Sequence, residues 1–250
     1  MKARSRVGVS RIALAAALVV VVVIAGVGAY LALAPSGHPA STTVSSTTTA
    51  STLSSALSVA VAAVPPSPLI SPGETQNYSS IQVSPAGSGA TGTLAVRAFA
   101  PSGLSLLLNQ TSVPLSEGVQ SIPTVLVASQ GISPGNYTVT VEISSSAVPA
   151  SNTTFVIRVV PMLITMLDVA FHPADATVAK GTPVTWLNLD STIGCCDPGY
   201  HTVSFTSGAN ATSPVMKRFD SYTYTFGTDG VVDYYCTIHP FMKGQVTVTG

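Results

Sequence analysis

Charged side chains are scarce in this sequence of 250 residues. Asp, Glu, Lys and Arg together make up 8% of it, whereas an average soluble domain has about 25%. The ten basic and ten acidic residues cancel, but four of the basic residues lie within the first eleven positions. The rest of the chain is therefore mildly acidic. It lacks the basic surface that binding to nucleic acid requires, so the sequence predicts no nucleic-acid partner.

Cysteine and histidine, the side chains that bind soft metals most strongly, are also few. The chain has three cysteines and four histidines, and residues 66–161 contain neither type. That long stretch has no thiol nucleophile, no histidine base and no soft-metal ligand. We interpret it as a spacer or docking region.

One long hydrophobic run covers residues 12–34, which hold no charged side chain. A helix needs roughly 20 apolar residues to cross a bilayer core, and basic residues before such a helix stay on the cytoplasmic side. We therefore expect residues 1–34 to form a basic cytoplasmic segment and a transmembrane anchor. A cleaved signal peptide is the alternative, because "ALA" at 32–34 matches a small-residue cleavage pattern. Both interpretations export the rest of the chain, and the anchor predicts a single-pass plasma-membrane protein with extracytoplasmic C-terminal domains.

Residues 35–65 form a Ser/Thr-rich segment. Twelve of the fifteen residues at 41–55 are Ser or Thr, and such a composition buries too little apolar surface to fold. We expect an extended linker that acts as a stalk.

The remaining sequence predicts an all-β protein with two β-sandwich domains. Short runs of alternating apolar and polar residues, such as "YTVTV" at 137–141, are separated by Gly-, Pro- and Ser-rich turns. Strands spaced in this way are typical of β-sandwiches. The "PGNYTVTV" stretch resembles a late strand of an immunoglobulin-like domain, which we assign to residues 66–160. The second domain covers residues 161–250.

Soft donors are concentrated near the C-terminus, in "CTIHPFM" at 236–242. Cys236, His239 and Met242 follow one another at intervals of three. Two histidines, one cysteine and a distant methionine form the ligand set of electron-transfer copper. Three residues of one short loop cannot surround an ion, so another histidine is needed. His201, at the start of "HTVSF", is the best placed.

Residues 162–250 resemble the cupredoxins, the small blue copper proteins. The short ligand loop "CTIHPFM" looks like that of amicyanin, whereas plastocyanins have a longer one. The segments "TPVTWLNLD", "HTVSF" and "DYYCTIHPFMKGQV" occur in that family's order. The resemblance implies a Greek-key β-sandwich that binds one type 1 copper ion. It implies His201, Cys236 and His239 as ligands, with Met242 as the axial one. It also implies that the protein carries single electrons by Cu(II)/Cu(I) cycling and is not an enzyme.

The resemblance further implies a docking surface, since in this family the edge of the loop histidine reaches the surface. Ile238, Pro240 and Phe241 flank His239 and would form an apolar collar around it. Redox proteins such as a respiratory complex, an oxidase or a dehydrogenase are the expected partners. Such a patch suits brief docking over a small interface.

Two polar residues are predicted to support the ligands from outside. Thr202 follows His201 where amicyanin and plastocyanin usually have Asn, and Asn188 ends the "TWLN" strand. Groups of this kind orient metal ligands and tune them. We expect the change to Thr to alter the reduction potential and to leave copper binding intact.

The turn before His201 is longer than is usual in the family and contains Cys195 and Cys196. These residues could be free thiols, a vicinal disulfide, an intermolecular bridge or a point of copper capture. Disulfide formation, either between these two cysteines or with another chain, is favoured in an extracytoplasmic location.

Three other functions compete with electron transfer. A copper storage or delivery protein is the alternative to an electron carrier, and only the cysteine pair supports it. Multicopper oxidases and copper nitrite reductases need further histidine clusters, whereas this sequence has no His-x-His pair. The third is an adhesive stalk whose last domain has lost its metal, but the intact ligand set argues against it.

His172, which lies next to a proline, is expected at the surface.

Overall fold

The computed structural model describes residues 58–86, 91–115, 118–192, 194 and 196–250. All regular secondary structure in these residues is β-strand, which confirms the all-β prediction. No helix among them has the length and apolar character to span a bilayer. The predicted transmembrane segment at 12–34 and most of the predicted linker lie outside the described residues.

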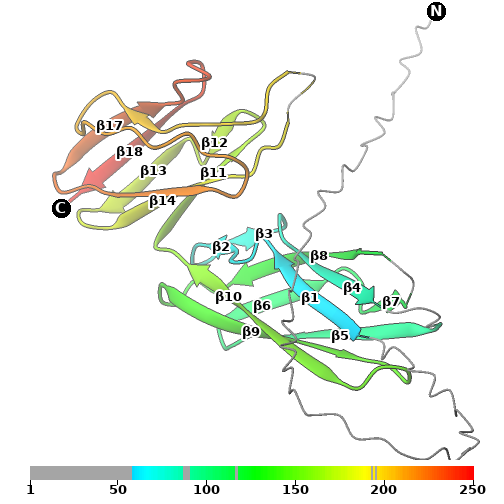
Figure 1. Cartoon of the computed structure of the whole chain (residues 1–250). Coiled ribbons are helices and arrows are strands. Elements are labelled where there is room, and N and C mark those ends of the chain that lie inside the picture. The colour runs from blue at the N-terminus through cyan, green and yellow to red at the C-terminus, as the bar shows by residue number, and fades with distance from the viewer. Residues whose placement is uncertain (1–57, 87–90, 116–117, 193, 195) are drawn as a thin grey trace, which may run out of the picture. The chain divides into compact units, whose positions relative to one another are not determined.

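Residues 58–159 form two five-stranded sheets (Figure 1). The first contains β1 (Ser58–Val64), β4 (Ser80–Ala86), β8 (Gln120–Ala128), β3 (Thr75–Gln76) and β6 (Leu104–Leu108). The second contains β2 (Leu69–Ile70), β10 (Ser151–Val159), β9 (Gly135–Ser144), β5 (Thr93–Phe99) and β7 (Ser112–Pro114). Every pairing is antiparallel except that between β2 and β10.

An aliphatic core joins these two sheets. Ile81 and Ile122 from the first sheet belong to the same buried cluster as Val139 and Val141 from the second. In β9 every second residue from Val139 to Ile143 is buried, as the alternation in its sequence predicts. Two sheets around one core make a β-sandwich; the finer immunoglobulin-like assignment remains a prediction.

The first strand departs from the sequence-based expectation. Residues 58–64, which the composition assigns to the linker, form β1 and pair along their whole length with β4. Ala63 is buried in the core and Val59 and Val61 pack against it. The physical reason is that "SVAVAAV" alternates apolar side chains within a Ser-rich context, and an edge strand needs to bury only one face.

Residues 162–249 form two four-stranded sheets (Figure 1). The first contains, in order, β12 (Ala170–His172), β11 (Met162–Leu167), β14 (Pro183–Asn188) and β16 (Ser221–Thr225). The second contains β13 (Asp175–Ala179), β18 (Lys243–Thr249), β17 (Gly230–Tyr235) and β15 (Ser204–Phe205). Among the strands described, none pairs across residue 160. The predicted domain boundary at 160/161 stays a prediction.

The core of this second part contains a group of aromatic rings in contact with one another. Trp186 from β14 is fully buried and meets Tyr234 from β17 edge to face, with ring centroids 5.3 Å apart. Phe205 on β15 contacts both rings at 5.9 and 6.3 Å. Edge-to-face pairs of this kind add to the stability that burial gives. They fix β17 and β15 against the opposite sheet, and the candidate site lies at the ends of these two strands.

Candidate metal centre

Cys236 is placed by the alternation of β17. Val232, Tyr234 and Cys236 are 3%, 1% and 0% exposed, whereas the residues between them face outward or are half-buried. The predicted inward direction of the thiol is therefore correct. Cys236 directly follows the last residue of β17, so it lies at one end of the sandwich, where the strands give way to loops.

The loop after Cys236 is closed by its own backbone. The Cys236 N–H donates to the Met242 carbonyl at 3.0 Å, and the Met242 N–H donates to the His239 carbonyl at 2.8 Å. These bonds bend residues 236–242 back on themselves before β18 begins. Met242 is 2% exposed and belongs to the same buried cluster as Cys236.

Three donor atoms converge at this loop. Cys236 Sγ lies 3.7 Å from His201 Nδ1 and 3.7 Å from His239 Nδ1, and the two nitrogens are 3.2 Å apart. Around one ion in a trigonal plane, bond lengths of about 2.0–2.1 Å to imidazole and about 2.3 Å to thiolate place the nitrogens about 3.5–3.6 Å apart and each nitrogen about 3.7–3.8 Å from the sulfur. The observed spacing is close to this, so these three residues fit a single soft metal ion.

His201 reaches the cluster through a backbone bridge rather than a long strand. The sequence predicts a strand that opens at His201, but the regular strand β15 covers only Ser204–Phe205. His201 instead exchanges two hydrogen bonds with Met216: its N–H donates to the Met216 carbonyl at 3.1 Å and its carbonyl accepts at 2.8 Å. This pairing places the His201 side chain, 0% exposed, beside Cys236.

A buried carboxylate holds the far side of the His201 ring. Asp190 Oδ2 lies 2.8 Å from His201 Nε2, and Asp190 is only 4% exposed. The same carboxylate accepts the N–H groups of Asp168 at 2.7 Å and Val169 at 3.0 Å. Metal-binding histidines commonly donate their second ring N–H to a carboxylate. Sequence reasoning missed Asp190; the available signal was an acid at the end of the apolar strand "TWLNLD", since acids are rarely buried without a partner.

Asn188 stands behind this arrangement and is completely buried. Its amide donates to the carbonyls of Gly199 at 2.8 Å and Met216 at 2.9 Å, and its oxygen accepts the Asp190 N–H at 2.9 Å. The side chain thus ties together the three segments that surround His201.

Thr202 connects the two halves of the site. Its N–H donates to Cys236 Sγ at 3.4 Å, and its hydroxyl lies 3.8 Å from the same sulfur. The hydroxyl also accepts the N–H of Thr237 at 2.8 Å and bonds to the Thr237 hydroxyl at 2.8 Å. The threonine therefore clamps the start of the loop to the His201 segment.

These contacts change the protonation of the copper-free site. Burial opposes charge on Cys236, but hydrogen bonds from His201 and from the backbone of Thr202 and His239 outweigh it, and the pKa of the thiol falls to about 6. Burial also opposes charge on His201, yet its contacts with Cys236 and Asp190 raise its pKa overall. The thiolate is the form that binds metal, so it is favoured before any ion arrives.

A second carboxylate, which sequence reasoning also missed, contacts His239. Asp197 Oδ2 lies 2.7 Å from His239 Nε2. The Gly199 N–H donates to Asp197 Oδ1 at 2.8 Å. This hydrogen bond is the largest cause of a lowered pKa of the Asp197 carboxyl, and the hydrogen bond with His239 is the next. No sequence signal marks the contact, because Asp197 lies forty-two residues before its partner in an irregular turn.

The predicted collar residues are at the surface. Phe241 is 73% exposed and Ile238 44% exposed, and Pro240 is also exposed. The ring of Phe241 meets that of His239 edge to face, with centroids 5.9 Å apart. Exposed apolar groups therefore lie next to a proposed ligand.

Of the other residues singled out from the sequence, His172 and Cys196 do not belong to the cluster of three donors. His172 is exposed and its Nε2 lies 3.1 Å from the Leu167 carbonyl, as expected of a surface histidine. Cys196 is exposed, and Cys195 falls outside the described residues. The state of the cysteine pair remains a prediction.

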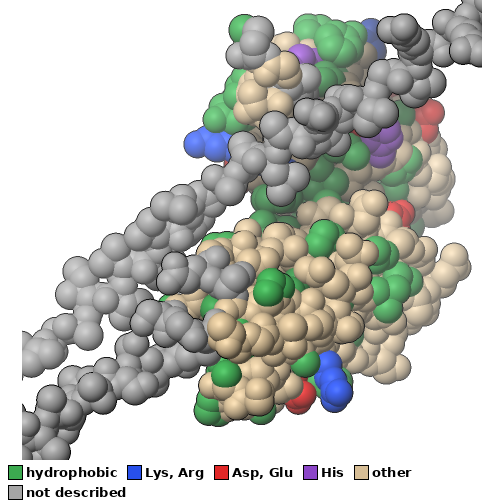
Figure 2. All heavy atoms as spheres, turned by 90° about the vertical axis from the view of Figure 1, so that its right-hand side faces the viewer, with side chains coloured by type: hydrophobic (Ala, Val, Ile, Leu, Met, Phe, Trp, Pro, Cys, Tyr) green, Lys and Arg blue, Asp and Glu red, His purple; other side chains and the backbone are tan. Residues whose placement is uncertain are grey.

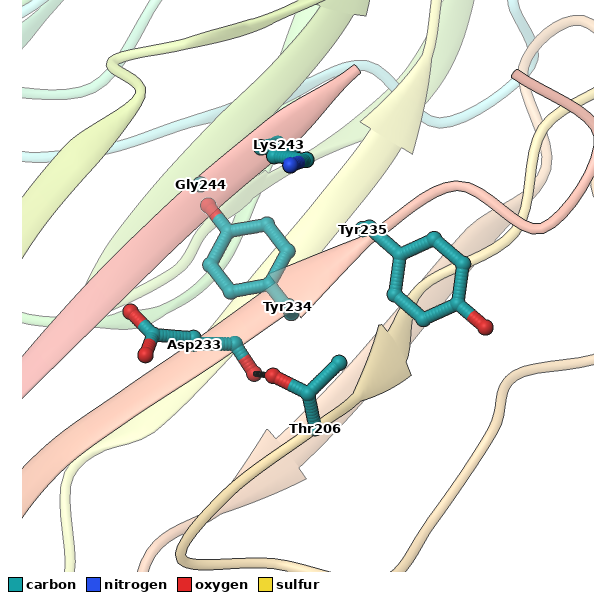
Figure 3. A pocket seen from close by; sticks show the side chains of 6 residues that line it. All are labelled: Thr206, Asp233, Tyr234, Tyr235, Lys243 and Gly244. Carbon is teal, nitrogen blue, oxygen red and sulfur yellow. Dashed lines mark hydrogen bonds between the residues drawn. The ribbon is translucent and has the colours of Figure 1, made fainter. Parts of the chain in front are cut away.

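An open pocket of about 330 Å³ lies along β17 and is lined by Thr206, Asp233, Tyr234, Tyr235, Lys243 and Gly244. In Figure 3, Tyr234 and Tyr235 point to opposite sides of the strand, and the Thr206 hydroxyl bonds to the Asp233 carbonyl at 3.2 Å. None of the proposed metal ligands lines this pocket. Blue and red side chains are few on the face shown in Figure 2, in keeping with the low charge of the sequence.

Comparison with known proteins agrees with this geometry. Residues 160–249 match the family described as copper binding proteins, plastocyanin/azurin family. Amicyanin from Paracoccus denitrificans is 32% identical over 91 residues, which cover 35% of this chain and 64% of that protein. Amicyanin-alpha from Methylorubrum extorquens is 33% identical over 82 residues, or 31% and 63% of the two chains. The match thus spans slightly less than two thirds of these two relatives.

Two further relatives extend the comparison. Amicyanin from Paracoccus versutus is 33% identical over 88 residues and is covered over 67% of its length. A solved structure of a reduced Cu(I) amicyanin variant, 32% identical, is covered over 81% of its length, with 35% of this chain aligned and a TM-score of 0.31. The chain therefore belongs, through residues 160–249, to the plastocyanin/azurin family of copper-binding proteins, whose members hold one type 1 copper ion.

Proposed function

We propose that this protein carries single electrons between redox partners, with copper held by His201, Cys236, His239 and Met242. The observation that carries the proposal is the meeting of three donor atoms at 3.2–3.7 Å, two of them from one loop and the third from thirty-five residues earlier. Two imidazoles and a thiolate, with a thioether farther away, are suited to one-electron chemistry at copper.

Copper, when bound, would supply a one-electron couple. The chain would supply donors that are buried from water and held in place by hydrogen bonds. The three donors are between 0% and 9% exposed. Hydrogen bonds to Thr202 and Asp190 hold the sulfur and one imidazole in place. Because Thr202 and Asp190 hold these donors in place, a change in the oxidation state of bound copper would need little rearrangement of the ligands, which would favour fast electron transfer.

We propose that Met242 would be the fourth and weakest ligand of the copper ion. It is buried within the same cluster as Cys236 and closes the loop through its backbone bonds. A thioether is a soft, weak ligand that adjusts the potential of such sites. Its replacement should alter the potential more than the occupancy.

Partners are expected to dock on the collar of Ile238, Pro240 and Phe241. These apolar side chains are exposed around the loop that carries His239. A small patch of this kind suits a transient complex that buries less than about 1,200 Å². The partner classes that fit are respiratory complexes, oxidases and dehydrogenases.

The location is proposed from the sequence alone. The apolar run at 12–34, the basic residues before it and the Ser/Thr-rich segment after it support a single-pass plasma-membrane protein. In this arrangement the copper domain works on the extracytoplasmic face, and the β-sandwich before it acts as a spacer.

A visible and electrochemical titration tests the function. Full-length protein, purified in mild detergent, should turn intensely blue with one equivalent of cupric ion and should show a reversible one-electron couple. The Cys236→Ser variant should do neither, since the thiolate is lost. A wild-type chain that binds only cuprous ion, without colour or a reversible couple, would instead indicate copper storage or delivery.

A further inference from the structure

The two proposed ligand histidines each have a carboxylate on their outer nitrogen, but the two carboxylates are held differently. Asp190 is buried and also accepts two backbone N–H groups. The Asp197 side chain is 30% exposed, and its contact with His239 is 2.7 Å long. Asp197 comes from the long turn before His201, so a surface segment supplies a group to the centre.

The contact fixes which nitrogen of His239 is free to bind metal. An ionised carboxylate only accepts hydrogen bonds, so the proton between Asp197 and His239 belongs to Nε2. The opposite nitrogen, Nδ1, then keeps its lone pair. That nitrogen is the one that lies 3.7 Å from Cys236 Sγ and 3.2 Å from His201 Nδ1.

The carboxylate is itself held in place. The Gly199 N–H donates to Asp197 Oδ1 at 2.8 Å, and the Gly199 carbonyl accepts from the buried amide of Asn188 at 2.8 Å. Gly199 has φ +68°, and a Cβ there would meet the Ser191 carbonyl. The turn can therefore adopt this shape only with glycine at 199, and it delivers Asp197 in a fixed position.

We propose that Asp197 is a positioning residue for His239, which sets the ring for metal binding and favours the cupric over the cuprous state. The inference rests on the proposed copper site. A negative group next to the centre stabilises the ion of higher charge more than the ion of lower charge. A carboxylate hydrogen bond also makes the imidazole a stronger donor.

The test uses full-length wild type, Asp197→Asn, Asp197→Ala and a matched control, Asp229→Asn. Asp229 is an exposed acid paired with Lys180. It precedes β17 while Cys236 follows it, so the two are about 23 Å apart along the strand. The control removes the same charge far from the site.

Three measurements are made on each protein: cupric affinity, cuprous affinity, and long-range ¹H–¹⁵N spectra of the copper-free chain. We expect Asp197→Ala to lower cupric affinity about 10–100-fold and to lower the cupric-to-cuprous affinity ratio. Each tenfold fall in that ratio is a rise of about 59 mV in potential. Asp197→Asn should lower the ratio less, and Asp229→Asn should match wild type. The spectra should show a slowly exchanging Nε2 proton on His239 in wild type and a rapidly exchanging one in Asp197→Ala.

The outcomes separate the two proposals. If wild type turns blue with copper and both Asp197 variants have wild-type affinity ratios and His239 spectra, the positioning role is refuted and the copper site stands. If wild type binds no cupric ion, both proposals fail. Equal changes in Asp197→Asn and Asp229→Asn would show a general charge effect and would also refute the positioning role.

Discussion

The backbone N–H of Thr202 points at the sulfur of Cys236 from 3.4 Å, across thirty-four residues of sequence. Its hydroxyl meanwhile accepts the N–H of Thr237. One residue thus supports the thiolate and anchors the residue after it.

The Thr202→Val substitution tests the second of these roles. Valine keeps the shape and the backbone N–H but removes the acceptor for Thr237. We expect the free energy of unfolding of the copper-free protein to fall by about 0.5–1.5 kcal/mol, measured by urea denaturation. Thr177→Val, on the exposed side of β13, is the control and should change stability by less than about 0.5 kcal/mol. Equal effects of the two variants would contradict the clamp.

Ionisation of Cys236 gives a pH prediction. In the copper-free protein the thiolate should titrate with a pKa of about 6, against 9.0 for an unperturbed thiol. The ultraviolet thiolate absorbance of wild type minus that of Cys236→Ser measures it and removes the contribution of the other cysteines. A difference curve centred at pH 8 or above would show that the hydrogen bonds do not overcome burial.

The sign of the stability effect follows from the same shift. A thiol whose pKa is lowered on folding stabilises the folded state fully above pH 9.0, and this contribution is lost as the pH falls through about 6. His201, whose pKa is raised, contributes in the opposite sense: its stabilisation is complete below pH 6.5 and is lost as the pH rises through its folded value. Urea denaturation of copper-free Cys236→Ser at several pH values should therefore show the larger loss, relative to wild type, toward pH 9.

Gly199 can be compared with Gly194 in the same turn. Both have positive φ, at +68° and +62°, but only at Gly199 would a Cβ meet other atoms. Gly194→Ala should cost about 1–2 kcal/mol from the left-handed backbone alone. Gly199→Ala should cost about 1–3 kcal/mol more from crowding and should also weaken copper binding. Equal midpoints for the two variants in thermal unfolding would contradict the close approach to Ser191.

Phe241 provides a test of docking. Phe241→Asp places a charge in the collar, so the electron self-exchange rate, which requires two collars to meet, should fall at least tenfold, and reduction by a physiological partner should slow. The blue absorption should be unchanged. Val231→Asp, at a residue 50% exposed near the other end of β17, should leave the rate near that of wild type. Similar rates for all three proteins would place the docking surface elsewhere.

The sequence predicts the strands and the loop well because both depend on local patterns. Alternation in "VVDYYC" correctly orients Cys236, and "CTIHPFM" brings two of the three clustered donors from one loop. Asp197 could not be predicted, since its contact with His239 joins residues forty-two positions apart and no local pattern marks it. Asp190 had a local signal, as an acid at the end of an apolar strand, but its partner His201 lies eleven residues farther along the chain. β1 was missed for a different reason: its alternation is built from Ala and Val in a region whose overall composition indicates a linker.

The backbone bonds that close residues 236–242 involve no metal atom. We therefore expect the loop to keep this shape when copper is removed, and we expect copper uptake to require no refolding. An incoming ion meets donors already gathered, so loading should be limited by encounter and by release of the ion's previous ligands. Loss of the ion should likewise leave a folded protein that can bind copper again.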